Sequence, residues 1–440
     1  MPSAESPLAT PDTNSRMSKS ADSESARPVP NDSAASVTAL PPKPTDVRYH
    51  SFDIWRGAAC LMLAAYHSTF YAEYAWQMHD RSTWSVASWA VRLIGWLWVG
   101  VPMFFVISGY CIAASTDSLR RKPHSLRSYV VRRVRRIYPP LWIMLGLAVL
   151  FTMTIGAIEA VATNCQQIPQ LSEFSLASWI GNLTASESWL HRLTGQENST
   201  YLMPNAWTLC YEEQFYLVTG LLLAISGARF FRLAAVVTVL TLVCRHGFRA
   251  AGIEVHGFFF DGHWLMFAAG ILVYTTLNYG DRRNRWMTCG VLGLFAVYAF
   301  VDRRLQTEHV QRHLDEYIFI SSLFGIALIV FRNLDKPIAG LTCLKPLAAC
   351  GRMSYSIYLT HYLLVVVVSS LFAAAGFHAD AHVAALVVPC CLLLSIPPAW
   401  VFNRTVERRF MNSRPKQTTA PNSGTETPPQ PRVTLAPQTP

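Results

Sequence analysis

Two ionisable residues in one apolar stretch are the first candidates for chemistry. Arg56 and His67 are eleven residues apart in FDIWRGAACLMLAAYH. On a helix this spacing places both on one face, about 16 Å apart along the axis. Arg56 lies near the end of the stretch, where an arginine can also snorkel to the membrane surface. His67 lies among apolar residues, so it is either a satisfied core histidine or a base that titrates near neutral pH.

A second apolar stretch carries acidic candidates. In WTLCYEEQFY, Glu212, Phe215 and Tyr216 share one face at helical spacing. Adjacent carboxylates in the first turns of a spanning helix are costly in lipid, so we expect at least one to point into a helix bundle. Glu212 is then either part of a site or an interfacial acid paired with a neighbouring arginine.

Small and basic residues form two further motifs. Ser108 and Gly109, in FFVISGY, allow close approach of helices. A basic run between residues 120 and 136 includes Arg133 and Arg136. This run either sets the membrane topology and contacts anionic lipid, or it binds a phosphate-bearing donor such as a CoA thioester.

A polar stripe of Ser354, Tyr358 and His361 at helical spacing lines either a cavity or a helix contact. Most of the ten cysteines lie in apolar stretches, where they act as small hydrophobes, and no C-x-x-C pair occurs. We therefore predict neither a metal site nor a disulfide framework. Glycine-rich phosphate-binding loops and the G-x-S-x-G elbow are also absent from the sequence.

The elements that must position these residues are membrane helices. The chain has 440 residues, of which 51% are hydrophobic and only 15% charged, against about 25% charged in soluble domains. Residues 49–411 break into ten apolar stretches, most of them near the length that spans a bilayer: 53–74, 91–114, 139–161, 207–226, 231–245, 263–279, 286–301, 315–331, 353–374 and 382–403. Because a backbone in lipid must satisfy its own hydrogen bonds, we predict an all-α integral membrane protein with about ten transmembrane helices.

The ends of the chain differ from this body. Residues 1–48 and 412–440 are rich in polar residues and proline, and we expect both to be disordered tails. The basic run at 120–136 should face the cytoplasm, which places both tails there as well, and the loop 162–206 outside. The protein is thus expected to be a multi-pass protein of the cell membrane. Its net charge of +10 lies largely on a cytoplasmic rim, so a nucleic-acid partner is not expected. Arg303 and Arg304 fall on the outer side and are exceptions.

Five motifs occur in order along the chain: Arg56-x10-His67, Phe105-Val-Ile-Ser-Gly-Tyr110, Arg133-Val-Arg-Arg-Ile-Tyr-Pro139, Trp207 through Tyr216, and Ser354 through His361. In this order they resemble the membrane acyltransferase-3 family, whose members O-acylate extracytoplasmic polysaccharides and related acceptors. The resemblance covers roughly residues 50–410. Two motifs depart from the family: Phe52-Asp-Ile-Trp-Arg-Gly57 lacks the glycine before the arginine, and Glu407-Arg-Arg-Phe410 lacks the closing proline.

The resemblance implies acyl transfer from an acyl-CoA co-substrate, most often acetyl-CoA, to a carbohydrate hydroxyl, with no bound cofactor. It implies catalytic roles for His67, Arg56 and Glu212. It implies that the donor is bound by Arg133, Arg136, Ser108 and Gly109. The acceptor or the pocket wall would involve Trp207, Tyr216, Tyr358 and His361. In this scheme His67 is either the general base or a transient acyl carrier, and Glu212 either orients His67 or binds acceptor hydroxyls.

Other readings of the sequence remain open. Ten spans with intramembrane His, Arg and Glu also suit a proton-coupled exporter, although no internal repeat is evident. A lipid or a small molecule could be the acceptor in place of a carbohydrate. The outer loop 162–206 carries Trp179, Trp189 and His191 and is either a sugar-binding segment or a plain connector.

Overall fold

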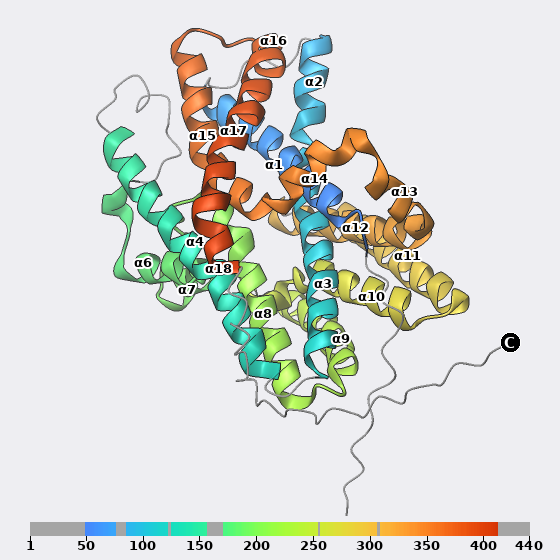
Figure 1. The fold of residues 1–440 in the computed structure, drawn as a ribbon. Helices are drawn as coiled ribbons and strands as arrows, with labels where there is room; N and C mark the ends of the chain where they lie inside the picture. The colour runs from blue at the N-terminus through green and yellow to red at the C-terminus, as the bar shows by residue number, and fades with distance from the viewer. Residues whose placement is uncertain are drawn as a thin grey trace, which may run out of the picture. The chain divides into compact units, whose positions relative to one another are not determined.

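The computed structural model describes residues 49–75, 85–121, 125–155, 170–253, 256–305 and 309–411. These residues are almost entirely helical, and no strand occurs within them (Figure 1). The tails that we predict at 1–48 and 412–440 lie outside the described residues.

Helices occur at all ten predicted stretches. The first four stretches correspond to α1 (Phe52–Ala75), α2 with α3 (Val86–Gly95 and Gly100–Leu119), α4 (Ser125–Ile155) and α8 (Trp207–Ser226). The next four are α9 (Phe230–Ala250), α10 (Trp264–Tyr279), α11 (Arg282–Leu305) and α12 (His309–Val330). The last two are α15 (Ser354–Ala374) and the run α16 (Asp380–His382), α17 (Val388–Phe402) and α18 (Arg408–Met411), joined by two π-helical turns.

Shorter helices fill the connections. The loop 162–206, which we predict to lie outside and call the outer loop, contains α6 (Leu176–Leu183) and α7 (Glu187–Leu193). Before α15 come α13 (Asp335–Gly340) and α14 (Lys345–Arg352). Asp335 accepts hydrogen bonds from the backbone N–H groups of His50 (2.7 Å) and Ser51 (2.8 Å), so the start of the body is tied to a connection far along the chain.

The lengths and surfaces of the helices indicate a multi-pass membrane protein. Within the described residues, seven helical segments are long and apolar enough to cross a bilayer, and only 22–56% of each is buried. Their exposed surface is rich in Leu, Val and Trp side chains, which suits lipid. The prediction of ten spans is not confirmed. Among the other three helices, α10 has 16 residues, and α8 carries the polar run Glu212 to Gln214 in its first turns.

Helix α4 begins earlier than predicted. We expected Pro139 and Pro140 to start this span, but they lie inside a helix of 31 residues that begins at Ser125. Each proline removes one intrahelical hydrogen bond without ending the helix. Buried residues on both sides of the prolines, Tyr129 before them and Leu141 after them, hold the two parts in the core. The arginines of the basic run therefore lie on the same helix as the membrane span.

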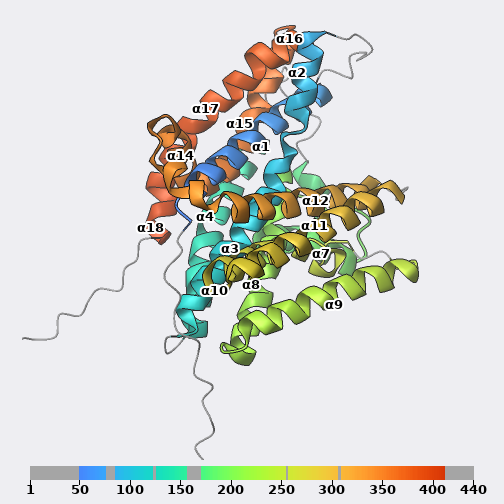
Figure 2. The same ribbon diagram turned by 90° about the vertical axis from the view of Figure 1, so that its right-hand side faces the viewer.

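Helix α1 is the centre of the packing. It packs against α3, α14, α15 and α17, and it lies beside α15 and α17 in both views (Figures 1 and 2). On its other side α3 packs against α10, where two glycines allow backbone contact. A Cβ at Gly109 would lie 2.0 Å from the carbonyl oxygen of Phe267, and one at Gly270 would lie 2.0 Å from that of Val106. Larger residues would force these helices apart.

Candidate active site

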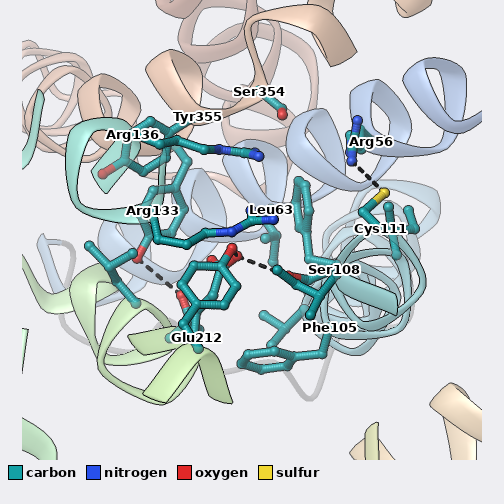
Figure 3. A pocket seen from close by; sticks show the side chains of 18 residues that line it. Arg56, Leu63, Phe105, Ser108, Cys111, Arg133, Arg136, Glu212, Ser354 and Tyr355 are labelled. Carbon is teal, nitrogen blue, oxygen red and sulfur yellow. Dashed lines mark hydrogen bonds between the residues drawn. The ribbon is translucent and has the colours of Figure 1, made fainter. Parts of the chain in front are cut away.

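A pocket between α1, α3, α4, α8 and α15 collects most of the predicted site residues. About 830 Å³ of space not filled by protein atoms lies within it, part of it open to the surroundings. Its walls are mainly apolar, with a small number of convergent polar groups. The predicted residues on its walls are Arg56, Ser108, Arg133, Arg136, Glu212, Tyr216, Ser354 and Tyr358 (Figure 3).

Glu212 is held in this pocket by two hydroxyl groups. Ser108 on α3 donates to its Oε1 at 2.9 Å, and Tyr216, one turn further along α8, donates to the same oxygen. These bonds fix a carboxylate at the junction of α3 and α8. The neighbouring Glu213 accepts instead from Tyr138 on α4 at 2.9 Å, so the two adjacent acids anchor different contacts.

Two arginines of α4 extend into the pocket. Arg133 donates to Ser115 Oγ at 2.8 Å, and its guanidinium lies 5.0 Å from the ring centre of Tyr216. Arg136 is three residues further on and thus on the same face. Its guanidinium is directed into the pocket, beside that of Arg133 (Figure 3). Arg136 makes no hydrogen bond or ion pair with the described residues, so its donors are available to a ligand.

Arg56 enters the pocket from the side of α1. Its Nη2 lies 2.9 Å from Cys111 Sγ, and its Nη1 lies 3.6 Å from Asp53 Oδ1. The side chain therefore does not simply snorkel away from the bundle. Three guanidinium groups and one carboxylate line one cavity, which leaves an excess of positive charge there, suited to a phosphate-bearing ligand.

The first two arginines of the basic run have a different role. Arg120 and Arg121 both pair with Asp117, at 2.7 Å and 3.5 Å. Tyr274 and Tyr279 donate to the other carboxylate oxygen, at 2.9 Å and 2.7 Å. This cluster joins α3 to α10, so these two arginines are structural, whereas Arg133 and Arg136 line the pocket.

His67 is paired with His361, not with Glu212. The Nδ1 of His67 lies 2.9 Å from the Nε2 of His361, and their rings are nearly parallel, at 5°. The Nδ1 of His361 lies 2.9 Å from the carbonyl oxygen of Ile357. A carbonyl can only accept, so His361 carries its proton on Nδ1, and its Nε2 accepts from His67. Neutral His67 is thereby held in the tautomer whose lone pair is on Nε2, the form that a base or nucleophile requires.

The histidine pair adjoins the pocket through α15. Tyr358, which lines the pocket, lies one turn before His361, and their ring centres are 6.4 Å apart. Tyr358 OH donates to the carbonyl of Asn205 at 2.6 Å, and Thr208 lies 3.0 Å from the same hydroxyl. The start of α8 is thus fixed against α15.

Two predicted site residues lie elsewhere. Gly109 does not line the pocket but packs on the backbone of α10, which favours the packing explanation over donor binding. Trp207 opens onto a second cavity. Sequence reasoning also missed Glu407 as a site-supporting residue. It is buried and accepts from Ser356 on α15 and from Asn403, at 2.7 Å, in a π-helical turn. Its position in the family's closing motif was the available signal.

The aromatic residues of the outer loop serve the packing of that loop. Trp179 packs on Phe174, with ring centres 5.0 Å apart, and Trp189 stacks on Phe258 at 5.8 Å. His191 is buried, and its Nδ1 lies 2.7 Å from the carbonyl of Glu187. These contacts favour the connector reading of these three residues over sugar binding.

Arg303, an exception to the predicted charge distribution, is neutralised locally. Its Nη2 lies 2.6 Å from Glu316 on α12. Nearby, Arg249 pairs with Asp302 at 2.8 Å, and the buried Arg245 pairs with Asp315. Acids thus compensate the positive charge at these ends of α9, α11 and α12.

Comparison with known proteins agrees with this site. The acyltransferase domain model of acyltransferase family 3 matches residues 49–404. The chain is 26% identical over 283 residues to BcsY of Komagataeibacter xylinus, named as a membrane-bound transacylase; the match covers 63% of this chain and 69% of BcsY. It is 24% identical over 374 residues to YrhL of Bacillus subtilis, named as a peptidoglycan O-acetyltransferase, covering 75% and 55%.

A third relative is the peptidoglycan O-acetyltransferase OatA of Listeria monocytogenes. It is 22% identical over 340 residues, which covers 72% of this chain and 49% of OatA. The chain therefore spans about half the length of YrhL and OatA. No solved structure matches the chain.

Proposed function

Because the chain belongs to acyltransferase family 3 and is a membrane acyltransferase, we propose that it moves an acyl group, most often acetyl, from cytoplasmic acyl-CoA to a hydroxyl of a cell-envelope or exported carbohydrate. The observation that carries the proposal is the pocket in which Arg56, Arg133 and Arg136 converge beside the His67–His361 pair. The names of YrhL and OatA support acetyl as the group and a glycan as the acceptor.

In this proposal the donor enters from the cytoplasm. Arg136, whose donors are available, and Arg133 bind its phosphates with charge-assisted hydrogen bonds. Arg56, on the opposite wall, stabilises the oxyanion that develops on the thioester carbonyl, as a fixed cation in a low-dielectric site can. Glu212 holds the hydroxyl groups of Ser108 and Tyr216 in place and limits the net charge of the pocket.

His67 acts as the general base. Its Nε2 takes the proton of the acceptor hydroxyl while that oxygen attacks the thioester carbonyl carbon. The C–S bond then breaks, and the CoA thiolate leaves and receives the proton from His67. His361 holds His67 in the tautomer and orientation that this step needs. If His67 carried the acyl group instead, the same tautomer would serve, and an acetylated enzyme would accumulate in the absence of acceptor.

The test is acyl transfer in isolated membranes. Membranes containing the wild-type protein are supplied with [14C]acetyl-CoA, and label in the glycan fraction is measured. We expect transfer by the wild type and a loss of 100-fold or more in His67→Ala. His246→Ala is the matched control, since His246 lies on α9 and contacts Tyr298 away from the pocket.

The wild type and the variants are compared at equal amounts of protein in the membrane, and each result below contradicts one part of the proposal. Activity retained in His67→Ala contradicts the assigned base. Coupled movement of a solute across the membrane without any acylation contradicts the enzyme and favours a transporter. Label confined to lipid or to a small molecule retains the acyl transfer but contradicts the carbohydrate acceptor.

A further inference from the structure

A second cavity lies at the start of α8, where it is lined by Trp207, the first residue of this helix. About 970 Å³ of space not filled by protein atoms lies within it, part of it open to the surroundings. Its lining differs from that of the first pocket, which Arg56, Arg133 and Arg136 line and which we call the arginine pocket. Among the described residues, no arginine or lysine lines it. Its walls are aromatic rings and imidazoles with one carboxylate and one leucine, contributed by Tyr66, Trp98, Trp207, Tyr211, His256, Asp261, His263, His313, Leu314 and Tyr317.

Three aromatic side chains from separate helical elements form one wall. The rings of Trp207 and Tyr317 are nearly parallel, at 10°, with centres 6.3 Å apart. The ring centre of Trp98 lies 5.2 Å from that of Tyr317. All three are only partly buried, although such rings gain from full burial. Flat aromatic faces that remain open to a cavity are suited to the C–H faces of a sugar ring.

A fixed acid–imidazole pair provides the polar wall. The Nδ1 of His263 lies 2.7 Å from Asp261 Oδ1. Asp261 is buried and also accepts from Tyr211 OH and from the backbone N–H of Gly257, at 3.2 Å. Because the Asp261 carboxylate accepts hydrogen bonds, it fixes the proton of His263 on Nδ1. Neutral His263 then presents the lone pair of Nε2 as an acceptor for a hydroxyl group.

The backbone is shaped to make this pair. Gly262, between the two residues, has a φ of +120°, a conformation that L side chains rarely adopt. A Cβ there would also lie 3.2 Å from both Arg245 and Leu314. The turn at Gly262 allows Asp261 and His263 to form a hydrogen bond with each other. The His263 ring also stacks on Tyr211, with ring centres 3.9 Å apart.

Residues close to the histidine pair line both cavities. On α1, Leu63 lines the arginine pocket and Tyr66, next to His67, lines the aromatic cavity. On α8, Thr208 lines the arginine pocket and Trp207 lines the aromatic cavity. Trp207 is about 7.5 Å from Glu212 along the helix axis. Residues beside His67 therefore line both the arginine pocket and the aromatic cavity, and the ring centre of Tyr66 is 5.4 Å from that of His67.

We propose that the aromatic cavity is the acceptor site, and that it binds a carbohydrate through Trp207 and Tyr317 stacking on a sugar ring and His263 accepting a hydroxyl hydrogen bond. This inference rests on the proposed acyltransferase function. The segments that form the cavity, around residues 256–263 and 313–317, are on the side that the charge pattern predicts to be outside the cell, where a glycan is accessible.

Binding of simple glycans tests the inference separately from catalysis. The probes are tetrasaccharides of β-1,4-linked glucose and of β-1,4-linked N-acetylglucosamine, titrated by calorimetry into the full chain in nanodiscs. Acetyl-CoA binding is measured on the same samples. We expect the wild type to bind at least one tetrasaccharide and Trp207→Leu to bind it roughly tenfold more weakly, with acetyl-CoA binding unchanged.

Matched variants separate stacking from folding. Tyr317→Phe keeps the ring and should keep the affinity, whereas Tyr317→Leu should lose it. Trp286→Leu, an exposed tryptophan on α11, should bind as the wild type does. The inference is overturned if the wild type binds neither tetrasaccharide or if Trp207→Leu and Tyr317→Leu bind as tightly as the wild type. Failure of acetyl transfer alongside lost acetyl-CoA binding would instead contradict the proposed function.

Discussion

The hydrogen bond between His67 and His361 leads to a quantitative prediction about double mutants. His361 is expected to act only through His67, by fixing its tautomer and orientation across a 2.9 Å bond. Removal of a net hydrogen bond costs about 1 kcal/mol, and we take loss of tautomer control to cost about as much again. The sum of about 2 kcal/mol corresponds to a decrease in kcat of about 30-fold for His361→Ala.

The decisive assay is a double-mutant cycle. His67→Ala removes the base and should lower kcat by about 100-fold to 10,000-fold. Because His361 then has nothing to orient, the double variant should be no slower than His67→Ala alone. His361→Gln should recover part of the rate, since its amide oxygen can accept from His67 Nδ1–H. The KM for acetyl-CoA should stay unchanged throughout, because neither histidine lines the arginine pocket.

Two results would refute this reasoning. Additive losses in the double variant would show that His361 acts independently of His67. Equal activity of His361→Gln and His361→Ala, at equal expression and equal melting temperature, would show that the hydrogen bond to His67 is not what matters. A merely structural role for His361 would lower the amount of folded protein instead of its kcat.

Three further predictions concern binding and stability. Arg136→Gln should raise the KM for acetyl-CoA about tenfold with little change in kcat, while Arg132→Gln, an exposed neighbour, should not; equal KM values would contradict the donor contact. Gly109→Ala should destabilise the protein in detergent by about 1–3 kcal/mol, because its Cβ would collide with the backbone of α10, whereas Gly146→Ala, with open space around it, serves as a control that should melt normally. Burial raises the pKa of Glu187 in the outer loop from 4.5 to about 7, so the folded loop keeps a proton that the unfolded loop loses in that interval. Hydrogen-exchange protection of the loop should therefore fall as the pH rises from about 4.5 to about 7 and stay constant above it, and Glu187→Gln should abolish that change.

Hydropathy was sufficient to predict where the long helices of the body lie, but not the short helices in the connections, such as α6, α7, α13 and α14. Each of the ten apolar stretches contains a helix, and 207–226 coincides with α8. The start of α4 was missed because prolines normally mark a first helical turn, whereas here Tyr129 and Leu141 are buried on both sides of them. The local sequence pattern does not show that packing against other helices stabilises α4 across its prolines.

The site was predictable as a set of residues but not as a set of contacts. Spacing placed Arg56 and His67 on one face of α1, and both do lie near the pocket. The partner of His67 was not predictable, because His361 is 294 residues away and no local signal distinguishes it from Glu212. The aromatic cavity was missed for the same reason, since Trp98, Trp207, His263 and Tyr317 belong to four separate segments, each ordinary by itself.

The separation of 294 residues between His67 and His361 has a consequence for biogenesis. At translation rates of about 5–20 residues per second, α1 emerges from the ribosome roughly 15–60 s before its partner on α15 exists. During that time the imidazole of His67 lacks the acceptor that fixes its tautomer. The base is completed only as the last helices enter the membrane, so a nascent or prematurely terminated chain that already carries Arg56, Arg133, Arg136 and Glu212 has no assembled histidine pair. Ribosome stalling before residue 361 would therefore produce chains that present the arginine residues but cannot complete the base.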